Sequence, residues 1–433
     1  MAQQMKDSGI EWIGEIPADW EVTKAKFILS ANDGGVWGND PADDGADKIV
    51  IRSTEQTIDG KWCIDTPAIR DLSAIPHASS RILPGDLLIT KSSGSDLHIG
   101  KTTLADEYFE QHECYFSNFI QRIRCKDYLP KLLWYLFNSN IVREQFVYLQ
   151  NTTSGIGNIN ADIIDNLLLP NPPLIMQQRI AAFLDRQCAE IDAVIERTKA
   201  TIEEYKKLKQ AVITEAVTKG VRGARKMKDS GIEWIGEIPE DWEVVRGKNL
   251  FVETNERSTT GEEELLTVSH ITGITPRSQK NVNMFMSESL VDYKICHVND
   301  IAANTMWMWQ GAIGVSKYHG VISPSYNVYR QTSDAYDPDY LDYLLRIRPM
   351  IDAYNAYSTG ITASRLRLYP EQFLSFFFFV PNREEQYEIV KHLNRMCGEM
   401  DNLIAKKTAL LTELETYKKS LIYEVVTGKK EVV

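Results

Sequence analysis

Four loops of this chain carry the side chains whose types and spacing could do chemistry: residues 91–101, 152–160, 305–314 and 358–367. Most of them place small, hydroxylated or amide side chains next to Lys, Arg or Trp. Such groups exchange hydrogen bonds with base edges and donate to phosphate oxygens. The chemistry that these loops favour is nucleic-acid binding. The alternative interpretation is that they are ordinary Gly- and Ser-rich turns.

The candidate DNA-contacting residues fall into two sets, one in each half of the chain. Those of the first half are Lys91, Ser92, Ser93, Ser95, His98, Lys101, Thr152, Thr153, Ser154, Asn158 and Asn160. Those of the second half are Thr305, Trp307, Trp309, Gln310, Lys317, Ser358, Thr359, Thr362, Ser364, Arg365 and Arg367. Trp307 and Trp309, which flank Met308, are either core residues or platforms on which bases stack.

A methyltransferase motif is incomplete in this sequence. Asn171-Pro172-Pro173-Leu174 resembles the Asn/Asp-Pro-Pro-aromatic motif of amino-methyltransferases, but Leu replaces the aromatic residue and no Gly-rich loop for S-adenosylmethionine precedes it. The second half has Val380-Pro381-Asn382-Arg383 at the matching place. A helix whose first turn is marked by Pro explains both sequences.

Metal-dependent and phosphate-binding motifs are also incomplete. Asp86 and Asp300 stand at matching strand starts, where a nuclease could hold a metal, but no Glu-x-Lys follows at a suitable spacing. An Asp that caps a turn is the preferred interpretation. The seven His residues form no HExxH pattern, and the chain has no P-loop. We therefore expect no catalytic residue, metal or cofactor on this chain.

The composition is that of a globular protein, with 433 residues, 43% hydrophobic and 25% charged, enough for two to four domains. No signal peptide or membrane-spanning run is visible, and the six Cys residues show no CxxC pairing, so we expect a cytoplasmic protein with reduced thiols. The formal charge of −12 does not favour nucleic acid by itself. Any DNA contact must rest on local clusters or on a partner that supplies positive charge.

An internal duplication organises the chain. MKDSGIEWIGEIPADWEV at residues 5–22 returns as MKDSGIEWIGEIPEDWEV at residues 227–244, with one difference in eighteen positions. Trp12 and Trp20 in this strip are expected packing anchors. A period of 222 residues is too long for a solenoid, so two whole units lie in tandem.

Two long helices are repeated at a constant offset of 209 residues, so that Gln177 matches Gln386 and Cys188 matches Cys397. They are expected from Leu174 to about Thr218 and from Arg383 to about Thr427, each with one narrow apolar stripe. The expected stripes are Ile180, Leu184, Cys188, Ile191, Ile195, Ile202, Tyr205, Leu208 and Val212, and Ile389, Leu393, Cys397, Met400, Ile404, Leu411, Leu414, Tyr417 and Leu421. Such helices need a partner, and we expect them to form an antiparallel coiled coil with a pseudo-two-fold axis.

The remaining sequence predicts two mixed α/β domains, which gives an α+β fold. In the first, the expected elements are strands at 48–51, 86–90 and 119–124, one helix over 128–147, and a helical turn followed by a strand at 162–169. The second repeats this plan, with a helix after Tyr336-Asp337-Pro338 and a closing strand within 373–380. The predicted boundaries are 1–170 and 227–380 for the two recognition domains, and 171–226 and 381–433 for the two spacer helices.

Three repeated motifs resemble the specificity subunit of type I restriction-modification enzymes. They are the strip DSGIEWIGEIPxDWEV, the helix starts Pro172, Gln177, Ile180 and Pro381, Gln386, Ile389, and the helix ends EAVT and EVVT. The resemblance covers essentially the whole chain. It implies two target recognition domains that each read half of a split double-stranded DNA sequence. It also implies helices that space these domains and dock two modification (methyltransferase) subunits, which restriction subunits then join.

The same resemblance implies that the chain itself is not an enzyme and that S-adenosylmethionine is held by the partner methyltransferase. Two other classes of function remain open from the sequence. One is a single-chain DNA methyltransferase or nuclease, which would transfer methyl groups or cleave DNA unaided. The other is a coiled-coil scaffold that binds protein rather than DNA.

Overall fold

The computed structural model describes residues 4–41, 47–74, 77–149, 157–280, 289–360 and 366–432, without the side chains of residues 96, 157 and 158. The chain divides into two compact units, one of residues 1–198 and 409–433 (unit 1) and one of residues 199–408 (unit 2). These units differ from the predicted segments because each contains one mixed α/β domain together with part of both long helices. In the described ranges, no helix is long and apolar enough to cross a membrane.

Unit 1 is built mainly of short strands. The strands are β1 (Met5–Asp7), β2 (Glu15–Pro17), β3 (Glu21–Lys24), β4 (Leu29–Gly34), β5 (Lys48–Ile51), β6 (Ala68–Arg70), β7 (Leu87–Thr90), β8 (Ser92–Ser93), β9 (Thr102–Leu104), β10 (Tyr115–Phe116), β11 (Ile120–Cys125), β12 (Gly157–Asn158) and β13 (Leu168–Asn171). The helices are α1 (Glu107–Gln111), α2 (Pro130–Phe137), α3 (Asn140–Leu149), α4 (Ala161–Asp165) and the 3₁₀ turns η1 (Ala25–Phe27), η2 (Ser53–Glu55), η3 (Ala78–Ser80) and η4 (Asp96–His98).

Unit 2 repeats this composition. Its strands are β14 (Met227–Asp229), β15 (Glu237–Pro239), β16 (Glu243–Arg246), β17 (Phe251–Thr254), β18 (Leu266–Ser269), β19 (Gly273–Pro276), β20 (Lys294–Cys296), β21 (Ile301–Ala303), β22 (Ile313–Val315), β23 (Gly320–Ile322), β24 (Asn327–Gln331) and β25 (Phe377–Val380). Its short helices are α6 (Gly247–Leu250), α7 (Pro338–Arg346), α8 (Arg348–Tyr357), α9 (Pro370–Ser375), η5 (Arg277–Gln279) and η6 (Met308–Gln310).

Each unit contains a four-stranded central sheet of the same plan. In unit 1 it is antiparallel with strand order β4-β11-β7-β9, and in unit 2 the order is β17-β24-β21-β22. The registers correspond, because Ile123 lies opposite Leu87 in one sheet and Tyr329 lies opposite Ile301 in the other. The strands predicted at 86–90 and 119–124 are confirmed as β7 and β11 of this sheet. The second unit follows the plan of the first.

The turn that leads into this sheet has the same construction twice. Gly85 has φ +86 and Asn299 has φ +72, the left-handed conformation that these residue types tolerate best. The next residue then caps the turn: Asp86 Oδ2 accepts from the Leu83 amide at 2.8 Å, and Asp300 Oδ2 accepts from the His297 amide at 2.9 Å. The turn-capping interpretation of the two Asp residues is therefore confirmed.

The helix predicted over residues 128–147 is wrong as a single helix, because α2 and α3 are separate. At the break, Asn138 Nδ2 donates to the carbonyls of Trp134 and Thr102, both at 2.9 Å, and Ser139 Oγ donates to the Leu136 carbonyl at 2.6 Å. Short polar side chains that bond to nearby backbone compete with helix continuation.

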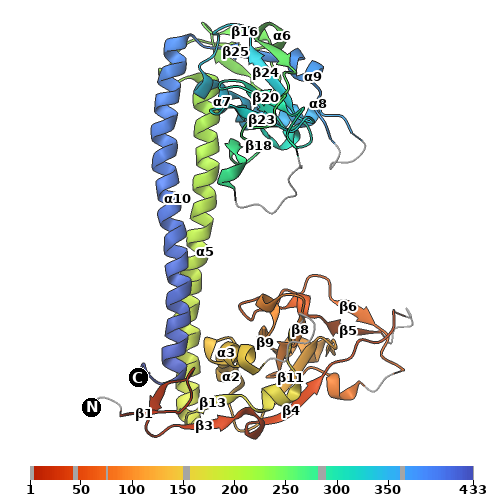
Figure 1. Cartoon of the computed structure of the whole chain (residues 1–433). Helices are drawn as coiled ribbons and strands as arrows, with labels where there is room; N and C mark the ends of the chain where they lie inside the picture. Colours follow the sequence, from red (N-terminus) through yellow and green to blue (C-terminus); the bar gives the residue numbers. More distant parts are fainter. Residues whose placement is uncertain are drawn as a thin grey trace. The chain divides into compact units, whose positions relative to one another are not determined.

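Each long helix runs without interruption: α5 spans Leu174–Lys219 and α10 spans Arg383–Val426 (Figure 1). The predicted ends are confirmed to within one residue. In unit 1 the beginning of α5 packs on the end of α10, since Leu184 and Leu421 belong to one core. In unit 2 the end of α5 packs on the beginning of α10, since Val217 and Ile389 belong to one core. The two helices are therefore antiparallel within each unit.

One ion pair occurs twice between the helices. Lys418 Nζ lies 2.5 Å from Asp192 Oδ1 in unit 1, and Lys209 Nζ lies 2.7 Å from Asp401 Oδ2 in unit 2. The offset of 209 converts Asp192 into Asp401 and Lys209 into Lys418, so equivalent residues make both contacts. Partly exposed pairs of this kind contribute little stability, but they fix the register of the helices.

Two predicted stripe positions are wrong. Leu208 and Tyr417, which are equivalent, are 49% and 51% exposed. The apolar seam passes from Tyr205 to Lys209 and from Leu414 to Lys418, a step of four residues that skips both positions. The two Lys side chains are only 25% and 21% exposed, because their aliphatic portions lie in the seam and their ammonium groups reach Asp401 and Asp192.

The repeated strip anchors each domain to a long helix. Trp20 and Trp242 are both buried, at 2% and 1% exposure, which confirms Trp20 as a packing anchor. Trp12 is half-buried against Tyr148. In unit 1 the Tyr423 hydroxyl of α10 donates to the Ile13 carbonyl at 3.1 Å.

Candidate nucleic-acid interface

The two predicted loops of unit 1 lie side by side. Strand β8 pairs antiparallel with β12, so Ser92 and Ser93 lie opposite residues 158 and 157. The Ile159 amide also donates to the Lys91 carbonyl at 2.8 Å. Residues that are far apart in sequence therefore meet in one surface, as an interface built from both loops requires.

Several candidates of unit 1 have contacts within the protein. Ser93 Oγ accepts from the Ser95 amide at 3.3 Å, and the amide oxygen of Asn160 caps α4 by accepting from Ile163 at 2.9 Å. His98 is half-buried, and its Nδ1 has no hydrogen-bond partner among the described residues. Ser92 also has a partner within the protein.

Two Lys residues of the first loop differ in their surroundings. Lys101 is 4% exposed and its Nζ donates to the carbonyls of Ser53 and Gln56, both at 2.8 Å. The structure gives this side chain an internal role, so we leave it out of the interface proposed below. Lys91 is half-buried at the surface, and burial lowers the pKa of its amine. Among the described residues, Lys91 makes no ion pair, so it remains a candidate phosphate contact.

Unit 2 presents aromatic rings in its first loop. Met308 is fully buried, whereas Trp307 is 47% exposed. The Trp307 ring lies nearly parallel to the rings of His270 and Trp309, with centroid distances of 6.3 and 6.2 Å and interplanar angles of 14° for both pairs. Trp307 is therefore not a core residue and remains a candidate on which a base could stack, whereas Trp309 is half-buried.

The other described candidates of unit 2 lie at loop and helix ends. Thr305 Oγ1 donates to the Ser325 carbonyl at 2.8 Å, and Ser358 Oγ donates to the Tyr354 carbonyl at 2.6 Å. Lys317 is 72% exposed and lies 2.9 Å from Asp339, while Gln310 is half-buried. Thr359 and Arg367 form a backbone bridge that closes the second loop. Thr152, Thr153, Ser154, Thr362, Ser364, Arg365 and the side chain of Asn158 lie outside the described residues.

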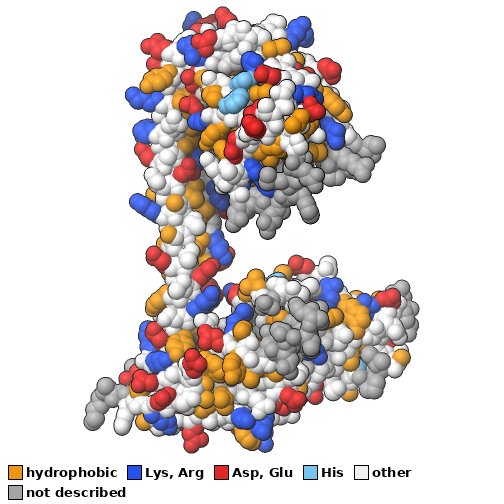
Figure 2. Space-filling view, viewed as in Figure 1, with side chains coloured by type: hydrophobic (Ala, Val, Ile, Leu, Met, Phe, Trp, Pro, Cys, Tyr) orange, Lys and Arg blue, Asp and Glu red, His pale blue; other side chains and the backbone are white. Residues whose placement is uncertain are grey.

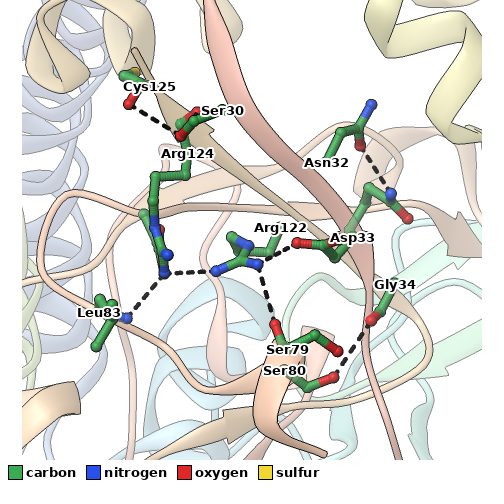
Figure 3. Close-up of polar contacts among 12 residues, drawn as sticks. Ser30, Asn32, Asp33, Gly34, Ser79, Ser80, Leu83, Arg122, Arg124 and Cys125 are labelled. Carbon is green, nitrogen blue, oxygen red and sulfur yellow. Dashed lines mark hydrogen bonds and ion pairs between the residues drawn. The ribbon is translucent and has the colours of Figure 1, made fainter.

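Unit 1 also contains a buried ionic cluster that sequence patterns did not predict. Arg124 Nε and Nη2 donate to the two oxygens of buried Asp86 at 2.6 and 2.8 Å, and this contact raises the pKa of Arg124. Arg122 is 4% exposed and reaches Asp33 and the Ser79 carbonyl (Figure 3). These two Arg side chains are neutralised inside the protein, so they position β11.

Unit 2 contains half of this cluster. Arg330 Nε and Nη2 donate to Asp300 at 2.8 and 2.9 Å, as Arg124 does to Asp86. At the position of Arg122, however, the register of β24 places buried Val328. The shared pair therefore belongs to the common domain plan, while Arg122 and Asp33 belong to unit 1.

The difference between the two clusters makes a stability prediction. Asp86→Ala removes one of the negative charges that balance the buried guanidinium of Arg122. We therefore expect unit 1 to lose about 3–5 kcal/mol of unfolding free energy. Asp300→Ala is the matched control in unit 2: Arg330 is 43% exposed and also faces Glu256, so a smaller loss is expected. Urea titrations of both variants, with hydrogen exchange read separately for each unit, test this. Equal losses would contradict it.

Charge on the molecule is mixed. On the face shown in Figure 2, Lys and Arg side chains are interspersed with Asp and Glu on both units. Among the described residues, no three His, Cys, Asp or Glu side chains gather as metal ligands. What the geometry offers is a set of loop surfaces with hydroxyl, amide, aromatic and isolated basic groups.

Comparison with known proteins finds similarity to one family. Residues 17–204 match the model of the type I restriction modification DNA specificity domain. A Methanocaldococcus jannaschii protein named as the MjaX type I restriction enzyme specificity subunit is 32% identical over 236 residues, which cover 54% of this chain and 53% of that one. The matched part of the chain is therefore similar to the DNA specificity domain of type I restriction enzymes.

Two solved structures share the fold of this chain. One comes from work on complex assembly and conformational transition of the type I R-M system; it has a TM-score of 0.70 at 16% identity and covers 96% of this chain and 99% of its own. The other is the HsdS subunit from Thermoanaerobacter tengcongensis, with a TM-score of 0.53 at 16% identity, covering 96% and 98%. The matched region spans about half the length of the curated relatives.

Proposed function

We propose that this chain is the DNA-recognition subunit of a type I restriction-modification complex and reads a bipartite site. The domain of unit 1 reads one half-site and that of unit 2 reads the other. The antiparallel helices set the distance between the half-sites and dock two methyltransferase subunits. Catalysis, and the S-adenosylmethionine that it uses, belong to those partners.

The observation that carries this proposal is the repetition of one frame with unlike loops. The central sheets correspond strand for strand, whereas the loops that leave β7 and β21 do not. After β7 the chain has Ser92 and Ser93, which pair with β12, and after β21 it has a stacked pair of Trp residues. Two equivalent supports with different contact groups suit two different half-sites.

Exposed apolar residues on the long helices support docking of two partner subunits. Leu403, Leu410 and Tyr417 on α10 recur every seven residues and are 41%, 41% and 51% exposed. Residues seven apart lie on one face of a helix, and such a stripe is completed by a partner helix. On α5, Val194 and Leu208 are equivalent to Leu403 and Tyr417 and are 45% and 49% exposed. The duplication thus repeats the two ends of the stripe, while half-buried Thr201 stands at the position equivalent to Leu410. We assign one copy to each methyltransferase subunit.

This stripe makes a prediction about assembly. Leu410→Asp places a charge in the proposed contact, so we expect at least tenfold weaker binding of the methyltransferase subunit at that site. Ala405→Asp is the matched control, because it puts the same charge on an exposed position away from the stripe. Analytical ultracentrifugation of the purified subunits measures both. Equal binding by the two variants would remove the stripe from the docking surface.

The DNA function itself is tested by competition. The chain together with its methyltransferase partner should retain a target duplex against an excess of random-sequence duplex, and the chain alone should transfer no methyl group. Methyl transfer by the purified chain would favour a single-chain enzyme. Partner binding without any sequence preference in DNA would favour a protein-binding scaffold.

A further inference from the structure

We propose that unit 1 contains a pocket for a single nucleobase, between the end of β4, η2 and the turn that joins β10 to β11. The pocket has a volume of about 260 Å³, and its lining includes Trp37, Arg52, Ser117, Asn118 and Phe119. This inference rests on the proposed function and deepens it, because the ligand would be a base unstacked from the target DNA. A free nucleotide has the same chemistry and is the other source to be tested.

The walls of the pocket are aromatic. Phe119 is 55% exposed although it directly precedes the buried start of β11. Trp37 is half-buried, and the guanidinium of Arg70 lies 4.2 Å from the centre of its ring, which holds the indole in place. Bases of any sequence can stack on such rings, and enzymes that act on single bases enclose them between aromatic side chains.

The pocket also contains a polar group without a partner. Ser117 is 1% exposed and lines the pocket, and its Oγ has no hydrogen-bond partner among the described residues. A buried hydroxyl is normally hydrogen-bonded, because burial without a partner is unfavourable. The hydroxyl can donate and accept, as the polar edge of a base requires. Asn118 adds an exposed amide beside it.

Close backbone packing positions Ser117. Gly35, just after β4, lies so near this segment that a Cβ there would be 2.2 Å from the Phe116 carbonyl oxygen and 2.3 Å from that of Ser117. Only Gly allows this approach. The hydroxyl is thus held by the fold, and Ser117→Ala removes it without disturbing that packing.

Basic side chains border the pocket on the side where the phosphate attached to the bound base would lie. Arg52 lines the pocket, and its guanidinium is fixed by two partners: Nε donates to Glu55 Oε1 at 2.9 Å and Nη2 donates to the Thr66 carbonyl at 2.8 Å. Lys91 adjoins the other wall, because its amide donates to the Phe119 carbonyl at 3.0 Å. Lys91 also begins the loop that pairs with β12, so the pocket opens next to the proposed DNA surface.

The test uses the complete complex of the chain with its methyltransferase subunits and its mapped target duplex. Mismatches are introduced one position at a time in the half-site read by unit 1. A mismatched base is easier to unstack, so one position should bind more tightly than the paired duplex. We expect Phe119→Ala to weaken binding of that duplex by about 5-fold to 100-fold, and Ser117→Ala to remove the gain from mismatch.

Phe27→Ala is the matched control, since Phe27 is an exposed aromatic residue of unit 1 outside the pocket, and it should keep the gain. A gain at no position, or a gain that survives in Phe119→Ala and Ser117→Ala, overturns a DNA base as the ligand. Titration of the complex with AMP, GMP, CMP and TMP tests the other source. Nucleotide binding that is lost in Phe119→Ala supports a free nucleotide as the ligand. If neither the gain from mismatch nor nucleotide binding is observed, the proposed pocket is overturned. Preference for the paired target over random duplex, measured in the same experiment, reports separately on the proposed function.

Discussion

Lengthening both long helices by one heptad should change the gap of the DNA target and leave both half-sites unchanged. The offset of the repeat and the two ion pairs place the centre of the helix pair between residues 200 and 201 on α5 and between 409 and 410 on α10. Heptads inserted at these two points keep the apolar seam in phase. Seven residues add about 10 Å of helix, which limits the increase to roughly three base pairs at about 3.4 Å each.

The readout is genome-wide mapping of methylated bases in cells that carry the complete system with the lengthened chain. A matched control replaces an existing heptad of each helix by the inserted sequence, which tests composition at constant length. The original gap retained in the lengthened chain would refute the spacer role. Altered half-site sequences would show that the helices influence reading itself.

Exchange of residues 23–170 for the corresponding segment of a similar type I specificity subunit should change one half-site completely and the other not at all. The physical reason is that this segment supplies the central sheet and both loops of unit 1, while unit 2 builds its own core from residues 213–397. We expect methylation at the original target to fall to background and to appear at a hybrid site. The same mapping measures it.

The reciprocal exchange in unit 2 is the control and should change the other half-site. A change in both halves after either exchange would mean that the two domains do not read independently. Loss of all methylation would be resolved by ultracentrifugation, because a chain that still binds its methyltransferase subunits has kept its helices.

The features that were predictable from the sequence depend on local patterns. The apolar period of α5 and α10, the Pro-Gly-Asp turn at residues 84–86 and the duplicated strip each carry their structural signal within a few residues. The helix break at Asn138 was missed because its cause is a side chain that bonds to Thr102, 36 residues away. The exposure of Leu208 and Tyr417 was missed because Lys side chains occupy the seam where apolar residues were expected.

The candidate interface was predictable only in outline. The composition of residues 91–101 and 152–160 predicts contact loops, but the pairing of β8 with β12 has no periodic signal in Ser- and Gly-rich sequence. The Arg122–Asp33 pair joins residues 89 positions apart, and the pocket at Ser117 joins three segments between Trp37 and Phe119. Contacts of this kind depend on tertiary packing, which neither composition nor spacing reveals.

The most direct measurement of the central claim is the methylation map of cells that carry the unaltered chain with its complete system. Two unlike readers on one helix pair predict a single split sequence, with two short and different defined halves, a gap of constant length without base preference, and one methylated base in each half. A continuous methylated sequence, or a gap that varies from site to site, would contradict this account.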